Sequence, residues 1–148
     1  MTATILAILA LGLADGPRAD DGAPPKAVRC DVQVILATNG APDIAPELRP
    51  LTRYLENSFG NRYSRFEQLA SHRVLVARDQ RGNVALPNGA ELGLSYLGAE
   101  EGLLRLTMDV GGLKTTVRVH DGGLFFQAGK KFRDGMLIVA IRATGVDG

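Results

Sequence analysis

The sequence has little of what most catalytic and nucleic-acid-binding sites require. Its 148 residues include one cysteine, two histidines and no tryptophan, and aromatic residues make up 5% of the chain. A single cysteine excludes an intrachain disulfide framework and a zinc site built from several thiolates. Scarce aromatic residues count against the stacking platforms that bind single-stranded nucleic acids and sugars. Aliphatic packing must therefore supply most of the stability.

Charge is also nearly balanced, with a formal net charge of +1 at pH 7. Nucleic acids and anionic membrane surfaces attract clustered Lys and Arg, so this balance predicts no nucleic-acid partner. The hydrophobic fraction of 45% and the charged fraction of 22% are ordinary for a soluble globular protein. The length predicts a single domain with a conventional core.

The first residues are typical of a targeting segment. Thr2 to Ala14 contains no charged residue and includes an apolar run from Ile5 to Leu11. This run is too short to span a membrane, but it suits the core of a signal peptide. We expect a signal peptide over residues 1–14, with cleavage after Ala19 as the alternative, and a periplasmic or secreted protein without a stable membrane span. No Lys or Arg precedes the run, and the competing interpretation is a buried N-terminal helix or strand.

Residues 15–27 are rich in Pro, Gly and Asp and predict a flexible tether. The single folded domain is expected over residues 28–145. Cys30 does not fit a lipidation site, because Val28 and Arg29 precede it where small or apolar residues are needed.

Alternating hydrophobicity predicts strands through most of this domain. Val28 to Leu36 alternates, and so do the segments 104–110 and 113–119. Residues 136–143 are apolar at both alternating sets of positions, as in a covered central strand. One apolar stripe has helical spacing and predicts an amphipathic helix that ends near Gly60: Ile44, Leu48, Leu51, Leu55 and Phe59. We predict an α+β, mainly β fold, an antiparallel β-sandwich or barrel-like sheet with one amphipathic helix.

Glycine-rich turns separate the predicted strands. Asn88-Gly89 is a strong hairpin signal because both residues accept positive φ angles, and Gly111-Gly112 offers the same freedom. Gly129 to Gly135 is expected to form the tip of a further hairpin. Strands at this spacing with short turns favour a sheet-on-sheet arrangement.

No linear motif predicts catalysis, a metal or a cofactor. Neither His72 nor His120 has a second ligand at metal-binding spacing. His120-Asp121 could be half of a base-and-orienter pair, but a turn position is the better interpretation. Cys30 could be a nucleophile or an intermolecular disulfide partner, although it lies on the apolar face of its strand and favours burial.

Two basic segments are candidates for contacts. Residues 123–131 depart from a phosphate-binding loop in glycine spacing and lack the Ser or Thr. The helix region mixes Arg and Tyr with interleaved Glu, which favours a salt-bridged surface over phosphate binding. The predicted partner contacts surround the last hairpin, where a solvated turn is the alternative: Phe125, Phe126, Lys130, Lys131, Phe132 and Arg133.

Two groups of motifs resemble small uncharacterised exported β-rich proteins of myxobacteria-like bacteria. The first is Leu48-Arg49-Pro50-Leu51-Thr52-Arg53-Tyr54-Leu55, followed by Phe59 and Tyr63-Ser64-Arg65-Phe66. The second combines Leu86-Pro87-Asn88-Gly89 with Asp134-Gly135-Met136-Leu137-Ile138. The resemblance covers most of the predicted domain. It implies an envelope location and a β-rich fold, and it supplies no catalytic residues.

These observations predict a non-catalytic exported protein that acts through protein–protein contacts, with another envelope protein or with itself. An accessory role in secretion, adhesion or surface assembly fits this expectation, and pairing at a sheet edge would be a natural contact mode. The alternative is a small-ligand or glycan-binding β-sandwich that uses Phe125, Phe126 and the basic loop. An enzyme would need a site assembled from residues scattered along the chain.

Overall fold

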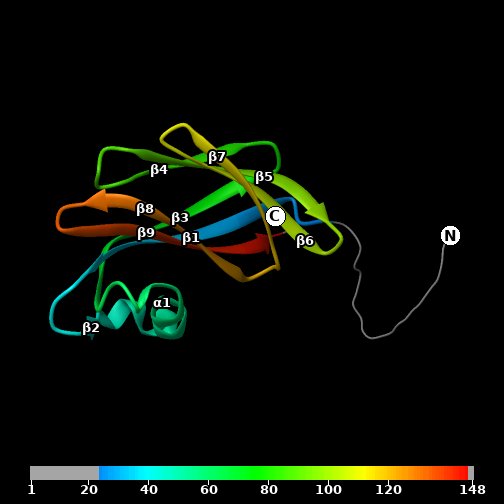
Figure 1. Cartoon of the computed structure of the whole chain (residues 1–148). Coiled ribbons are helices and arrows are strands. Elements are labelled where there is room, and N and C mark those ends of the chain that lie inside the picture. The colour runs from blue at the N-terminus through cyan, green and yellow to red at the C-terminus, as the bar shows by residue number, and fades with distance from the viewer. Residues whose placement is uncertain (1–23, 147–148) are drawn as a thin grey trace, which may run out of the picture.

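The computed structural model describes residues 24–146, and the predicted signal peptide and residues 15–23 lie outside them. Strands make up 65% and helices 11% of the described residues, which confirms the mainly β fold with one helical segment. The elements appear in Figure 1 in this order: β1 (Ala27–Thr38), β2 (Asp43–Ile44), η1 (Pro46–Leu51), α1 (Thr52–Phe59), β3 (Arg65–Ala77), β4 (Arg81–Ala85), β5 (Glu91–Glu100), β6 (Leu103–Val110), β7 (Leu113–Val119), β8 (Gly123–Phe132) and β9 (Gly135–Val146).

The strands form two sheets. The first has the order β2-β3-β1-β9-β8, and the second has the order β4-β5-β6-β7. The second sheet is antiparallel throughout. The first is mixed rather than purely antiparallel, because the two-residue β2 runs parallel to β3. This short pair follows a connection through the helical segment, which returns the chain in the same direction.

Three layers lie on top of one another, with the first sheet between the second sheet and the helix (Figure 1). The alternation of β1 explains how this middle layer is covered on both faces. Val28, Cys30 and Val32 point into the cluster between the sheets, whereas Ile35 and Ala37 point into the cluster under the helix. The strand β9 is buried in the same two-sided way, as its continuous apolar sequence predicts.

The helical segment is shorter and less regular than its apolar stripe predicts. Ile44 belongs to β2, and the segment begins as the 3-10 helix η1, which contains Pro50. A proline lacks the N–H that an α-helix needs at this point, so regular α1 begins only at Thr52. Leu48, Leu51 and Leu55 still lie buried against the first sheet. The predicted end at Gly60 is confirmed.

A β-bulge in β3 changes which layer the strand faces. The pairing with β1 passes from Ala70 opposite Val34 to Gln68 opposite Ile35, so Leu69 has no partner of its own. Before the bulge, Phe66 packs under the helix. After it, even-numbered residues such as Val76 pack between the sheets.

The hairpin at Asn88-Gly89 is present, but its turn differs from the expected one. The Gly89 N–H donates to the carbonyl of Leu86 at 3.1 Å, and only Gly89 of the pair has a positive φ, +86°. Asn88 acts through its side chain, whose Oδ1 accepts a hydrogen bond from the Ala90 N–H at 3.1 Å. Pro87 occupies the turn position that its fixed φ suits.

The last residues of the segment predicted as a tether are attached to the domain. The Tyr96 hydroxyl donates to the Pro25 carbonyl at 2.7 Å, and the Arg78 N–H donates to the Lys26 carbonyl at 3.0 Å. Ala27 is already the first residue of β1. In the part of the chain from 24 to 146, no helix has the length and apolar character needed to cross a membrane.

Candidate functional site

The single cysteine is a core residue. Cys30 is fully buried between the sheets, as expected from its place on the apolar face of β1. Burial raises the pKa of its thiol to about 12, and the negative charge of Asp31 adds to this rise. A thiol of this kind carries almost no thiolate at neutral pH and cannot reach another molecule without unfolding. The structure therefore gives no support to Cys30 as a nucleophile or as an intermolecular disulfide partner.

Neither histidine belongs to a cluster of metal-ligating side chains in the described part of the chain. His72 is half-buried in β3 opposite Val32. His120 is exposed and precedes the turn between β7 and β8. Among residues 24–146, no group of three or more His, Cys, Asp or Glu side chains could hold a metal ion.

The prediction that salt bridges cover the helix surface is wrong for the described residues. No ion pair within 24–146 includes Glu47, Glu56 or Glu67. Arg65 instead pairs with Asp43, at 4.0 Å between Nη1 and Oδ2. Glu67 lies in β3 rather than in the helix, and Arg53 and Glu56 form no ion pair although they are three residues apart in α1.

Phe125 and Phe126 lie on opposite faces of β8 and share no surface. Phe125 packs against the cluster between the sheets. Phe126 packs toward the helix, with ring centroids 6.2 Å from Tyr54 and 6.1 Å from Phe59. Neighbouring residues of a strand point to opposite faces, so adjacency in the sequence does not make a common platform.

The remaining predicted contact residues lie at the end of the β8–β9 hairpin. The strands continue farther than expected, and the turn itself is Arg133-Asp134. The Arg133 guanidinium lies 4.9 Å from the centroid of the Phe132 ring, which is partly buried against the core. Lys130 and Lys131 are both exposed, and Lys130 also lines a cavity between the sheets.

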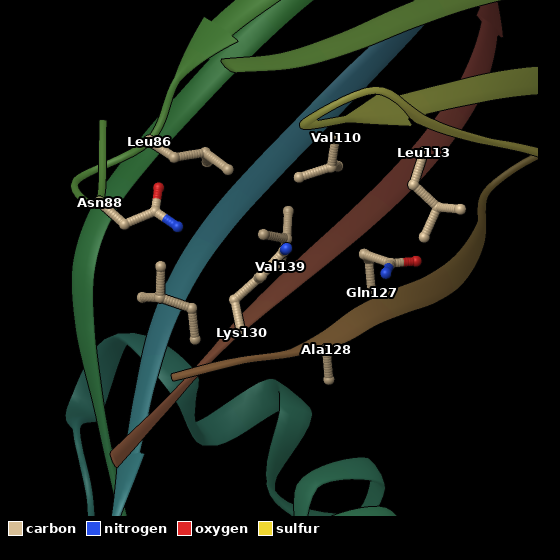
Figure 2. A pocket seen from close by; sticks show the side chains of 9 residues that line it. Leu86, Asn88, Val110, Leu113, Gln127, Ala128, Lys130 and Val139 are labelled. Carbon is tan, nitrogen blue, oxygen red and sulfur yellow. The ribbon is translucent and has the colours of Figure 1, made fainter. Parts of the chain in front are cut away.

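This cavity has a volume of about 210 Å³ and opens at one end of the sandwich (Figure 2). Lys130 is the one charged residue of its wall, and Asn88 and Gln127 add polar groups. Figure 2 shows Lys130 and the aliphatic side chain of Val139 at its centre, with Leu113 and Asn88 on opposite sides. The other walls are aliphatic: Leu86, Val110, Ala128 and Leu137. The cavity is thus apolar with one cation.

An open seam continues from this cavity, formed by the outer edges of β7 and β8. Each strand is the last of its sheet, so neither edge has a strand partner within the described chain. The two edges meet at the connecting turn, where a side chain at Gly123 would come within 2.4 Å of Val119. At the other end, Leu113 and Thr115 are exposed, although they lie on the same face of β7 as the half-buried Val117. The seam is wide at Leu113 and narrow at Gly123.

The sequence predicted the strands of the seam but not the cavity. Of the predicted contact residues, only Lys130 lines it, and the others lie on the helix side, in the core or at the turn. The available signal was Leu113, a large apolar residue in a strand that is otherwise polar near the preceding turn. Its 64% exposure shows that the described chain covers only a minor part of it.

A second cavity, of about 240 Å³, lies beside the helix and is lined by Asp43, Ile44, Glu56 and Tyr63 among others. It borders the ion pair of Asp43 with Arg65. The strand edge that adjoins it belongs to β2, which is two residues long and pairs with β3 on its other side.

Compared with protein-family models, with curated proteins and with solved structures, this chain matches none. The geometry of the open seam is therefore the observation from which a function is inferred.

Proposed function

We propose that this protein is a non-catalytic interaction module that binds another protein along the open seam. One observation supports this most directly: the unpaired edge of β7 lies beside an apolar cavity, and Leu113 at its wide end is 64% exposed. An unpaired strand edge offers a row of N–H and C=O groups to an incoming strand. Strand addition draws affinity from this backbone pairing and specificity from side-chain pockets beside it.

The partner is expected in the cell envelope. The uncharged N-terminus with its apolar run from Ile5 to Leu11 supports export, and the resemblance stated above agrees with it. The module would then be periplasmic or secreted, with an accessory role in secretion, adhesion or surface assembly. Intact-mass measurement after cell fractionation tests this: loss of residues 1–14 or 1–19 is expected. A full-length mass in the cytosol would contradict export without affecting the seam.

Site-specific crosslinking tests the proposed contact. A photoreactive residue in place of Leu113 should give a discrete adduct with one partner in intact cells. The control position is Arg53, which is exposed on α1 and lies outside the seam. Adducts of the same size and yield from both positions, or none from Leu113, would contradict the proposal.

The cavity itself favours a second candidate, the binding of a small amphipathic molecule. Its apolar walls and Lys130 would suit a short acyl chain with an anionic group. However, about 210 Å³ is less than the roughly 300–1,000 Å³ typical of ligand pockets. A thermal-shift screen with short-chain fatty acids decides: binding raises the unfolding midpoint with occupancy, and no shift up to millimolar concentrations would exclude this candidate.

A further inference from the structure

We infer that the segment bound in the open seam is an acidic peptide that adds to β7 as an extended strand and places one aliphatic side chain in the cavity. This inference rests on the proposed function and names the chemistry of the partner. It combines three features of the described residues: the direction of the β7 backbone groups, the charge of the two seam strands and the walls of the cavity.

The backbone of β7 presents alternate residues to an incoming strand. Val110 pairs with Leu113 across the two-residue turn Gly111-Gly112. The residues that close such a turn form a hydrogen-bonded pair, and the pairs of the ladder then alternate. The N–H and C=O groups of Lys114, Thr116 and Arg118 therefore point away from β6, toward the seam.

The stretch that forms the two seam strands is positively charged relative to the rest of the chain, although Lys131 lies on the helix side of β8. Residues 113–132 contain four Lys or Arg and one Asp, a formal net charge of +3, whereas the whole chain has +1. The rest of the chain thus has a formal charge of −2. Arg118 is 3.4 Å from Glu100, but no ion pair within residues 24–146 includes Lys130. Charge complementarity therefore favours an acidic partner.

The cavity adds an anchor beside this edge. Its volume of about 210 Å³ and its aliphatic walls suit one Leu or Ile side chain better than a larger group. Lys130 in the same wall would lie on the face of that side chain, where it could pair with a carboxylate two residues away in the extended segment. The immediate neighbours of the apolar residue would point to the outer face, beside Lys114 and Arg118. The expected motif is therefore an apolar residue with Asp or Glu at the adjacent positions and two residues away.

A second copy of this chain fits the seam less well. Antiparallel pairing of two β7 strands about Thr116 would place Lys114 of one copy opposite Arg118 of the other. Like charges directly opposite each other destabilise a strand pair. The same cations would favour a strand that presents acidic residues at these positions.

Selection from a random peptide display library on the immobilised full-length chain tests the inference. Peptides with an apolar residue between acidic ones should be enriched, and their affinity should fall about tenfold in Lys130→Glu, equivalent to 1.4 kcal/mol. The matched control is Arg53→Glu, the same change of charge on the helix, which should leave the affinity unchanged. Binding should also weaken as salt increases.

Variants that block strand pairing at the outer edge of β7 test strand addition separately from the acidic motif. Thr116→Pro removes an amide that points into the seam and should abolish binding, whereas Thr116→Val keeps the amide and should retain it. If Thr116→Pro does not fold, N-methylation of alternate peptide residues removes the matching donors instead.

The outcomes differ for the two proposals. Binding that is blocked at Thr116 but prefers neutral or basic peptides would overturn the acidic motif alone. No enriched peptide, or binding indifferent both to Thr116→Pro and to N-methylation, would overturn the proposed function as well.

Discussion

The two long sides of the sandwich differ in how the sheets meet. On the side of β3 and β4 the sheets close on each other, since Gly82 lies against Val74 and Val76 without a side chain of its own. A parallel bridge between Arg78 and Tyr96 continues this closure. On the side of β7 and β8 the edges separate and leave the cavity between them.

This difference shows that closure depends on side-chain volume at the edge. A residue without a Cβ lets β4 approach β3, and the backbone groups nearby are then satisfied, as in the 3.0 Å hydrogen bond from the Asp79 N–H to the Tyr96 carbonyl. The open side has Leu113 and Lys130 at the corresponding edges. Substitutions on the closed side should therefore lower the free energy of unfolding, and substitutions on the open side should affect the binding of a partner.

The largest expected effect on the free energy of unfolding comes from a Leu→Ala substitution, compared at a buried position in β5 and at the exposed position in β7. Leu94→Ala in β5 removes a fully buried side chain and should cost about 2–5 kcal/mol of unfolding free energy. Leu113→Ala in β7 should change it by less than about 0.5 kcal/mol, because that side chain is already exposed. Urea unfolding measures both. Equal losses would show that Leu113 is covered in solution.

A somewhat smaller effect on stability is expected from adding a side chain at Gly82, where β4 lies against β3. In Gly82→Ala the new Cβ would lie 2.5 Å from Val74 Cγ1, so the sheets must separate, at a cost of about 1–3 kcal/mol. The double variant with Val74→Ala makes room for the methyl group and should lose less than the two single losses added together. Additive losses in urea unfolding would argue that Gly82 does not control the approach of β4.

Alkaline pH should lower the free energy of unfolding, because the buried thiol of Cys30 resists deprotonation in the folded state. The pKa of the folded thiol, about 12, lies above the ordinary value of 9.0, so folding favours the neutral thiol. Its contribution is fully present below pH 9 and is lost as pH rises from 9 toward 12; at pH 10 the loss is about 1.4 kcal/mol. Unfolding free energies at pH 7.5 and 10 measure it. Cys30→Ala corrects for other groups, and an identical pH dependence in this variant would contradict the prediction.

The smallest expected effect on stability comes from the hydrogen bond that attaches Pro25, just before β1, to β5. Tyr96→Phe removes the hydroxyl that donates to the Pro25 carbonyl at 2.7 Å and should cost about 0.5–1.5 kcal/mol. Tyr54→Phe is the control, because that ring is half-exposed on the helix. Thermal unfolding compares them, and a loss in Tyr54→Phe as large as in Tyr96→Phe would count against a specific role of this hydrogen bond.

The parts of the fold that depend on local patterning were predictable. Alternation located the strands around Val32, Leu106 and Val117, and apolar residues on both faces identified β9 as an inner strand. The helical stripe located Leu48, Leu51 and Leu55, which are indeed buried. Such patterns are visible in the sequence because neighbours in one element set them.

The parts that depend on distant residues were not predictable. The bulge at Leu69 reverses the alternation of β3 halfway along, and a single strand period cannot describe both halves. The cavity combines the turns near Asn88 and Leu113 with β8 and β9, which no local pattern brings together. The separation of Phe125 from Phe126 follows from strand geometry, but which layer each ring meets depends on the packing of the sheets.

The pairing of β1 with β9 has a consequence for how the protein is made. These strands are the first and last of the described chain, yet they are neighbours over eleven residue pairs, from Ala27 with Val146 to Ala37 with Met136. The strand β9 follows every other described strand in the sequence, so the middle of the first sheet cannot assemble until β9 has left the ribosome. Contacts between residues so distant in sequence also slow the folding of the finished chain. A chain interrupted before β9 would lack an inner strand of the first sheet and would expose two apolar surfaces at once.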